Sequence, residues 1–165
     1  MMTVTDTTII RGRLDEVFEC FWDPTLWPRI TPHVKQVEII AWQGAHQQFK
    51  MCVEANGKPH WMESEREAVD GRRITYRQTR PPVFFLEHTG EWGFAEVDDG
   101  VQVTLIHRVS IDEAKAQEVL NVGSRAEAET LIQQTLKRNG RLTMTAIKRK
   151  IEGASAAQAA VEQRP

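Results

Sequence analysis

The sequence predicts an α+β fold of the helix-grip type, in which a bent antiparallel sheet of about seven strands surrounds a long C-terminal helix. Segments with strand character follow one another through short turns, which favours antiparallel pairing. Residues 124–151 repeat apolar side chains at helical spacing over a length that can cover one face of a sheet. The 165 residues, 41% of them hydrophobic, suffice for one domain with its own core. A sheet bent around one helix leaves a lumen, so we expect an internal cavity.

The N-terminal part predicts one strand followed by two short helices. Residues 3–11 are rich in β-branched side chains and form the first strand. Apolar residues then recur at helical spacing over 14–22, and Pro24 ends that helix. Two further prolines within 25–33 predict a second, shorter helical turn.

Six strands are predicted next, because apolar and polar residues alternate between strong turn signals. The turns are expected at Asn56-Gly57, Asp70-Gly71, Pro81-Pro82 and Asp98-Asp99-Gly100. The expected strands are residues 34–42, 48–55, 60–67, 73–79, 83–97 and 101–111.

The C-terminal part changes character after Asp112. Residues 113–122 predict a short helical or irregular link, and Ser124 with Glu127 forms a capping box that begins the long helix. We expect a single domain over residues 1–152. Residues 153–165 contain too few apolar side chains to pack firmly and are expected to form a flexible tail.

Composition excludes several classes of function. A net charge of −2 argues against a nucleic-acid binder, and no apolar run is long enough to cross a membrane. The N-terminus lacks a signal-peptide pattern, and Cys20 and Cys52 stand too far apart for a redox motif, so we expect a cytoplasmic protein. Neither a metal-binding motif such as HExxH nor a Gly-rich phosphate loop occurs, and we expect no metal and no cofactor.

Strand alternation indicates which side chains face the lumen. Trp61, Glu63, Glu65 and Glu67 share one face, and three carboxylates require solvent. The opposite face of that strand carries Ser64 and Arg66. With the registers that the turns impose, a polar belt is predicted across the sheet: Ser64, Arg66, Tyr76, His88 and His107. Around it we expect a mostly apolar, substrate-binding wall: Trp27, Phe49, Met51, His60, Met62, Phe84, Leu86, Trp92, Leu105 and Asn139.

Each of these residues has a structural interpretation beside the functional one. Arg66 pairs either with an internal carboxylate or helix carbonyls, or with an oxygen of a ligand, because a buried guanidinium needs an acceptor. The histidines are either satisfied core residues or proton-transfer groups. Trp27 and Trp92 are either core or pocket wall.

Two segments resemble a known family. The stretch LDEVFECFWDPTLWPRITPHV resembles the opening of Bet v 1-like (START) polyketide cyclase domains, and HWMESEREAVDGRRITYRQTRPPVFF resembles the segment of bacterial aromatic polyketide aromatase/cyclases that carries an inward Ser and Arg two residues apart. The last helix, LKRNGRLTMTAIKRKIE, is similar to that family's closing helix. The resemblance covers about residues 5–152.

The resemblance implies an enzyme that needs no cofactor. Aromatase/cyclases fold a poly-β-ketone tethered to an acyl carrier protein, promote an intramolecular aldol reaction and assist dehydration to an aromatic ring. By this resemblance Ser64 and Arg66 match the functional pair, and Trp27 and Trp92 match pocket residues. The chemistry itself suggests that Arg66 stabilises an oxyanion while His88, His107 or Tyr76 exchanges protons.

Two alternatives remain at this point. A non-catalytic carrier of a lipid, quinone or aromatic ligand would share the fold. A partner-binding module could instead use the sheet edge or the face that carries Trp61. For the enzyme, an acidic carrier protein is expected to meet Arg29, Lys35 and Arg80 near the mouth of the lumen, and the chain is expected to be a monomer or a homodimer.

Overall fold

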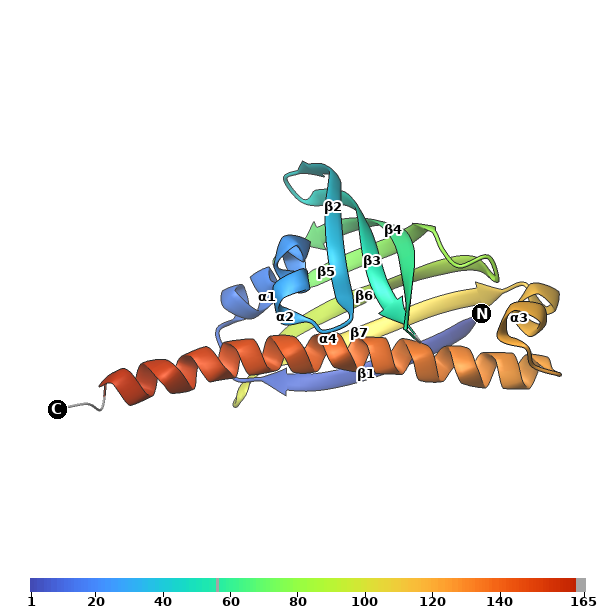
Figure 1. Ribbon diagram of the computed structural model, residues 1–165. Coiled ribbons are helices and arrows are strands. Elements are labelled where there is room, and N and C mark those ends of the chain that lie inside the picture. The colour runs from blue at the N-terminus through green and yellow to red at the C-terminus, as the bar shows by residue number, and fades with distance from the viewer. Residues whose placement is uncertain (56, 163–165) are drawn as a thin grey trace.

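The computed structural model describes residues 1–55 and 57–162 and shows a sheet curved over one long helix (Figure 1). The seven-stranded antiparallel sheet has the order β1-β7-β6-β5-β4-β3-β2, which confirms the predicted α+β helix-grip fold. Its strands are β1 (Met2–Ile10), β2 (Val34–Gln43), β3 (His46–Ala55), β4 (Lys58–Val69), β5 (Arg73–Arg80), β6 (Phe85–Val97) and β7 (Gly100–Ile111). The helices are α1 (Leu14–Trp22), the 3₁₀ turn η1 (Pro24–Leu26), α2 (Trp27–Ile30), α3 (Glu113–Leu120) and α4 (Arg125–Glu162).

The turns set the predicted registers. Asp70 and Gly71 both have positive φ, the geometry of a tight hairpin whose backbone twist suits the flanking strands. As a result Arg66 stands opposite Tyr76, and Gly90 stands opposite His107, as the sequence predicts. The predicted turn at Asn56-Gly57 includes Asn56, which lies outside the described residues.

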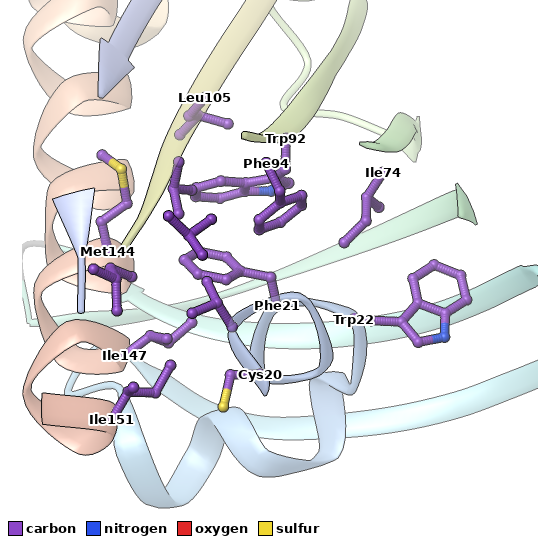
Figure 2. Packing of buried hydrophobic residues seen from close by; sticks show 14 residues of the cluster. Cys20, Phe21, Trp22, Ile74, Trp92, Phe94, Leu105, Met144, Ile147 and Ile151 are labelled. Atoms are coloured by element: carbon purple, nitrogen blue, oxygen red, sulfur yellow. The ribbon is translucent and has the colours of Figure 1, made fainter. Parts of the chain in front are cut away.

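The main core lies between the sheet, α1 and α4 (Figure 2). Phe21 of α1 packs against Trp92 and Phe94 of β6, with ring centroids 4.8 and 5.4 Å apart. Met144 and Ile147 close the core from α4. This packing fixes the end of α1 against the inner face of the sheet.

Helix α4 begins as predicted, since Ser124 Oγ accepts from the Glu127 amide and the Glu127 carboxylate accepts from the Gly123 amide. It also covers the edge strand β1, because Lys148 donates to the Ile9 carbonyl and Arg141 binds Asp6. The predicted end near residue 151 is wrong, because the helix continues to Glu162. The added turns are rich in alanine, a strong helix former, and so need no buried face.

The start of β6 differs from the prediction. A bulge lies between Phe85 and Glu87, and the extra residue leaves Leu86 68% exposed rather than facing the lumen. Phe84 precedes the strand and reaches the interior from the turn, packing against a second cluster that contains Val109 and Leu136. Within the described residues, no helix is both long enough and apolar enough to span a bilayer.

Candidate functional site

Three predicted polar side chains meet on the inner face of the sheet. His107 of β7 is the centre of the group. Its Nδ1 contacts the Tyr76 hydroxyl from β5, and it lies 3.1 Å from Nε2 of His88 of β6. His88 is 3% exposed. The structure therefore brings together three of the five residues of the predicted belt.

Gly90 makes the contact between Tyr76 and His107 possible. Gly90 lies on β6, opposite Tyr76 on one side and His107 on the other. A Cβ atom built at Gly90 would lie 2.4 Å from Tyr76 Oη and 2.2 Å from the Ile106 carbonyl oxygen. Because glycine has no side chain, the tyrosine ring crosses over β6 and reaches a strand that is not its neighbour.

Two tautomers are compatible with the contacts of His107 Nδ1. Either Nδ1 accepts from both the Tyr76 hydroxyl and His88 Nε2, or it carries the hydrogen and donates to both. In each case, of the two remaining ring nitrogens, His107 Nε2 and His88 Nδ1, one is an N–H donor and the other an acceptor. Both His107 Nε2 and His88 Nδ1 are buried without a hydrogen-bond partner among the described residues.

Burial keeps the group uncharged at neutral pH. Desolvation lowers the pKa of His88 to about 4 and, together with the neighbouring His88, that of His107 to about 3. Desolvation also raises the pKa of Tyr76 well above its usual value. The cluster therefore offers neutral hydrogen-bonding groups rather than charges.

Arg66 holds the C-terminal end of α1. Its Nη1 donates to the Phe21 carbonyl at 2.9 Å and its Nη2 to the Trp22 carbonyl at 2.5 Å. These carbonyls have no partner inside the helix, because α1 ends there, and a cation favours the negative end of the helix dipole. The prediction that an oxygen of a ligand would be its acceptor is thus wrong for these two bonds, and the alternative with helix carbonyls is correct.

Gln47 completes this anchor and was not among the predicted site residues. Its Oε1 accepts from Arg66 Nε at 3.1 Å and from Nη2 at 2.7 Å, while its Nε2 donates to the Trp22 carbonyl at 2.9 Å. Gln47 is buried on the inner face of β3. Its alternation with Phe49 and Met51 along that strand was the available signal.

The charge of Arg66 is surrounded by aromatic rings. The guanidinium carbon lies 4.9 to 5.1 Å from the ring centroids of Trp22, Trp27 and Phe49. Desolvation lowers the pKa of Arg66 to about 9, so the group stays protonated at neutral pH. All its hydrogen-bond acceptors among the described residues are neutral, and the positive charge is not balanced by a contacting carboxylate.

The remaining predicted residues divide into core, wall and surface. Trp92 and Leu105 lie in the main core, and Trp27 and Phe49 in a smaller cluster, where Trp27 Nε1 donates to the Cys20 carbonyl. Ser64 is buried, and Met51, Met62 and Asn139 are half-buried. His60 is exposed at the far end of β4, so its predicted place in the lumen is wrong. No group of three potential metal ligands occurs among the described residues.

Two hollows open on the molecule. One, of about 530 Å³, lies between α1 and α4 and includes Glu16, Cys20 and Lys150. The other, of about 450 Å³, is lined by residues of β2, β3, β4 and β5 and includes Gln47, Arg66 and Tyr76. Two residues of the predicted polar belt, Arg66 and Tyr76, therefore line this second hollow, whereas His88 and His107 line neither.

Comparison with known proteins identifies the family to which this architecture belongs. The model of the family described as "Polyketide cyclase / dehydrase and lipid transport" matches residues 1–152. The chain belongs to this family. A bifunctional cyclase/dehydratase of the actinorhodin polyketide synthase of Streptomyces coelicolor is 32% identical over an alignment of 142 residues, and the match covers 79% of this chain and 44% of that protein. The granaticin counterpart of Streptomyces violaceoruber is 29% identical over 147 residues, 87% of this chain and 45% of that protein.

Solved structures agree with this assignment. The di-domain ARO/CYC BexL from the BE-7585A biosynthetic pathway is 31% identical with a TM-score of 0.86, covering 92% of this chain and 50% of that one. The Zhui aromatase/cyclase of a Streptomyces species shares the fold, with a TM-score of 0.81 at 23% identity over 92% of this chain and 93% of that one. The chain spans about half the length of the curated relatives it matches.

Proposed function

We propose that this protein is an aromatase/cyclase that folds a poly-β-ketone, promotes its intramolecular aldol cyclisation and assists dehydration to an aromatic ring. The observation that carries the proposal is the Arg66 cation, buried among aromatic rings and bound only by neutral acceptors. A positive charge in such surroundings stabilises an anion strongly, because little solvent screens it. The family membership and the relatives' names support the same reaction.

The aldol step generates an anion twice. A methylene between two carbonyls loses a proton and becomes an enolate, whose carbon forms a bond with a carbonyl carbon further along the chain. The oxygen of that carbonyl becomes an alkoxide and takes up a proton, and loss of water then leaves a carbon–carbon double bond. Arg66 contributes through its charge to the enolate and the alkoxide, since at least four of its five N–H groups are held by the protein.

The histidine pair suits proton transfer to and from oxygen. One of the two neutral rings presents an N–H and the other a bare nitrogen, so one can donate to a carbonyl oxygen while the other accepts from a hydroxyl. A neutral imidazole can polarise a carbonyl in this way. Because methylene protons between two carbonyls are already acidic, the shape of the interior contributes through positioning.

We further propose a polyketide-synthase acyl carrier protein as the partner that delivers the substrate, in the cytoplasm. Arg29, Lys35 and Arg80 are exposed, as an acidic partner would require. Lys35 and Arg80 also form surface ion pairs with Glu54 and Glu63, which hold them only weakly. Charge reversal at all three should slow turnover of the tethered substrate while leaving a free substrate analogue unaffected, and equal turnover of the tethered substrate would contradict this partner.

Reconstitution with a minimal polyketide synthase and its carrier protein tests the reaction. Mass spectrometry and NMR would compare the products formed with wild type, with His107→Phe and with no added protein. We expect wild type to convert shunt products into one defined aromatic ring and His107→Phe to do so more slowly. Products identical to the no-protein control, with a substrate of suitable chain length, would overturn the proposal and favour a non-catalytic carrier of aromatic or lipid ligands.

A further inference from the structure

The turn between β5 and β6 presents apolar side chains to solvent. Residues 81–86, with the sequence PPVFFL, are all apolar. Phe84 and Phe85 pack against the second core cluster, whereas Val83 is 70% and Leu86 68% exposed. Among the large apolar side chains of the described residues, only that of Met1, at the end of the chain, is more exposed. Two such side chains in one turn indicate a site of contact with a partner.

This turn is held firmly, so the exposure is a feature of the fold. The Phe85 amide donates to the Pro82 carbonyl at 2.9 Å, and the Asp112 amide donates to the Phe84 carbonyl at 2.9 Å. The second bond ties the turn to the segment that leads into α3, which lies at the end of the molecule opposite the C-terminus (Figure 1). The Phe85 ring also packs against the His88 ring, with centroids 5.3 Å apart. The turn is thus joined directly to the histidine pair.

The strands on both sides of β5 diverge next to this turn. The ladder between β4 and β5 ends at the pair Glu63–Arg80, although β4 begins at Lys58. The ladder between β5 and β6 ends at the pair Arg77–Thr89, although both strands continue towards the turn. The sheet is therefore least tightly paired where the turn stands.

Arg80 adds a positive charge beside the exposed side chains. It immediately precedes the turn, and its side chain is 79% exposed, whereas that of its ion-pair partner Glu63 is 12% exposed. The surface therefore presents the cation more than the carboxylate. An apolar contact bordered by a positive charge suits an acidic partner that also carries apolar side chains.

The size and charge of this surface argue against a second copy of the chain as the partner. Stable interfaces bury about 1,200–2,000 Å² in total, and two side chains in one turn supply a small part of that area. A two-fold contact centred on the turn would also bring the two copies of Arg80 together, and like charges repel. A small apolar contact with complementary charge suits a partner that binds briefly and leaves after delivery.

We infer that residues 80–86 form the docking surface for the acyl carrier protein, with Val83 and Leu86 as the apolar contact and Arg80 as the charge. The inference rests on the proposed function in one respect, because that function names a carrier protein as the partner. A carrier protein docked at this turn holds the tethered chain close to Phe85 and His88, where the strands diverge.

Binding of a carrier protein that bears no acyl chain tests the docking surface without any turnover. Calorimetry would compare wild type with the double variant Val83→Ser/Leu86→Ser, which we expect to bind the carrier protein about tenfold more weakly because two apolar contacts are lost. Ile40→Ser/Val161→Ser is the matched control, since it removes two exposed apolar side chains from β2 and from the end of α4, and it should bind as wild type does.

Turnover and NMR give two further measurements of the same surface. In Val83→Ser/Leu86→Ser the KM for carrier-tethered substrate should rise about tenfold, while kcat and the turnover of a free substrate analogue stay unchanged. Titration of ¹⁵N-labelled wild type with unlabelled carrier protein needs no variant. The amide resonances of residues 83–87 should move, while those of residues 153–158, at the other end of the molecule, should stay in place (Figure 1).

The outcomes separate this inference from the proposed reaction. Equal carrier affinity in wild type and Val83→Ser/Leu86→Ser, or unmoved resonances of residues 83–87, would overturn the docking surface. A dimer, or binding to phosphatidylglycerol vesicles, that the same double variant abolishes would assign the turn to another partner and overturn it too. A free analogue that is cyclised while carrier affinity ignores the turn keeps the proposed reaction and loses the docking surface. A carrier protein that binds at the turn without any cyclised product has the opposite meaning.

Discussion

Arg66 and the histidine pair occupy the same interior, yet their hydrogen bonding is opposite. The Arg66 guanidinium is bound by two helix carbonyls and by Gln47. The histidines bind each other and Tyr76, and each retains a buried nitrogen with no partner among the described residues. A polar group whose hydrogen bonds are all made within the protein stabilises the fold and acts on a ligand through its charge. A buried polar atom that has no hydrogen-bond partner in the protein is available to bind a ligand directly.

Removing Arg66, whose hydrogen bonds the protein itself supplies, should have the largest effect on stability. Arg66→Ala leaves the Phe21 and Trp22 carbonyls and the Gln47 oxygen short of donors in a dry interior. We expect the free energy of unfolding, measured in urea, to fall by about 3–5 kcal/mol. Arg77→Ala is the matched control on the outer face of β5 and should cost less than about 1 kcal/mol. Equal costs for the two variants would contradict the anchoring role.

Gly90→Ala should disturb the histidine cluster rather than the Arg66 anchor. The added Cβ would collide with the Tyr76 ring and the Ile106 carbonyl, so Tyr76 must move from His107 at a cost of about 1–3 kcal/mol. Gly93→Ala is a close control on the same strand, where an added Cβ meets nothing within 4 Å. Thermal unfolding would compare the two. A Gly90→Ala protein as stable as Gly93→Ala would show that Tyr76 does not cross Gly90.

Gln47→Leu should destabilise the protein less than Arg66→Ala, because it removes only part of the Arg66 anchor. Two Arg66 bonds and the donor to the Trp22 carbonyl are lost, while the bonds from Arg66 to Phe21 and Trp22 remain. We expect a loss of about 1–3 kcal/mol, smaller than that of Arg66→Ala. Gln48→Leu, one residue along and on the outer face, controls for the loss of an amide and should cost under about 1 kcal/mol. A cost for Gln47→Leu equal to that of its control would remove Gln47 from the anchor.

Acid should weaken the fold through the histidines. Their pKa values in the folded protein, about 4 and about 3, lie below the ordinary 6.5, so the unfolded chain binds protons first as pH falls. Stability is therefore lost progressively from about pH 6.5 towards pH 3–4. His88→Phe should flatten the slope of unfolding free energy against pH in that window. Equal slopes for wild type and His88→Phe would contradict the burial of His88.

Much of the site could be predicted because strand registers follow from turns. Asp70-Gly71 and Asp98-Asp99-Gly100 fix the pairing, and alternation then places Arg66, Tyr76, His88 and His107 on one face. The bulge before Glu87 carries no clear sequence signal, and it moves Leu86 to the surface.

The partner of Arg66 could not be predicted from the pattern. It depends on where α1 ends above the sheet, and that position is set by packing of Phe21 on Trp92 rather than by any local motif. Gln47 was open to prediction, since it alternates with Phe49 and Met51 on the inner face of β3. Its residue type argues the other way, because a glutamine in a strand is usually a surface residue.

The measurement that tests the contrast most directly is a titration of ¹⁵N-labelled protein with 2-naphthol, followed by NMR of the histidine ring nitrogens and of the arginine Nε–H groups. We expect the resonances of His88 Nδ1 and His107 Nε2 to move on binding, while that of Arg66 Nε–H, held by Gln47, stays in place. Movement of the Arg66 resonance with unchanged histidine resonances would contradict it, and would place the ligand against the group that the protein has already satisfied.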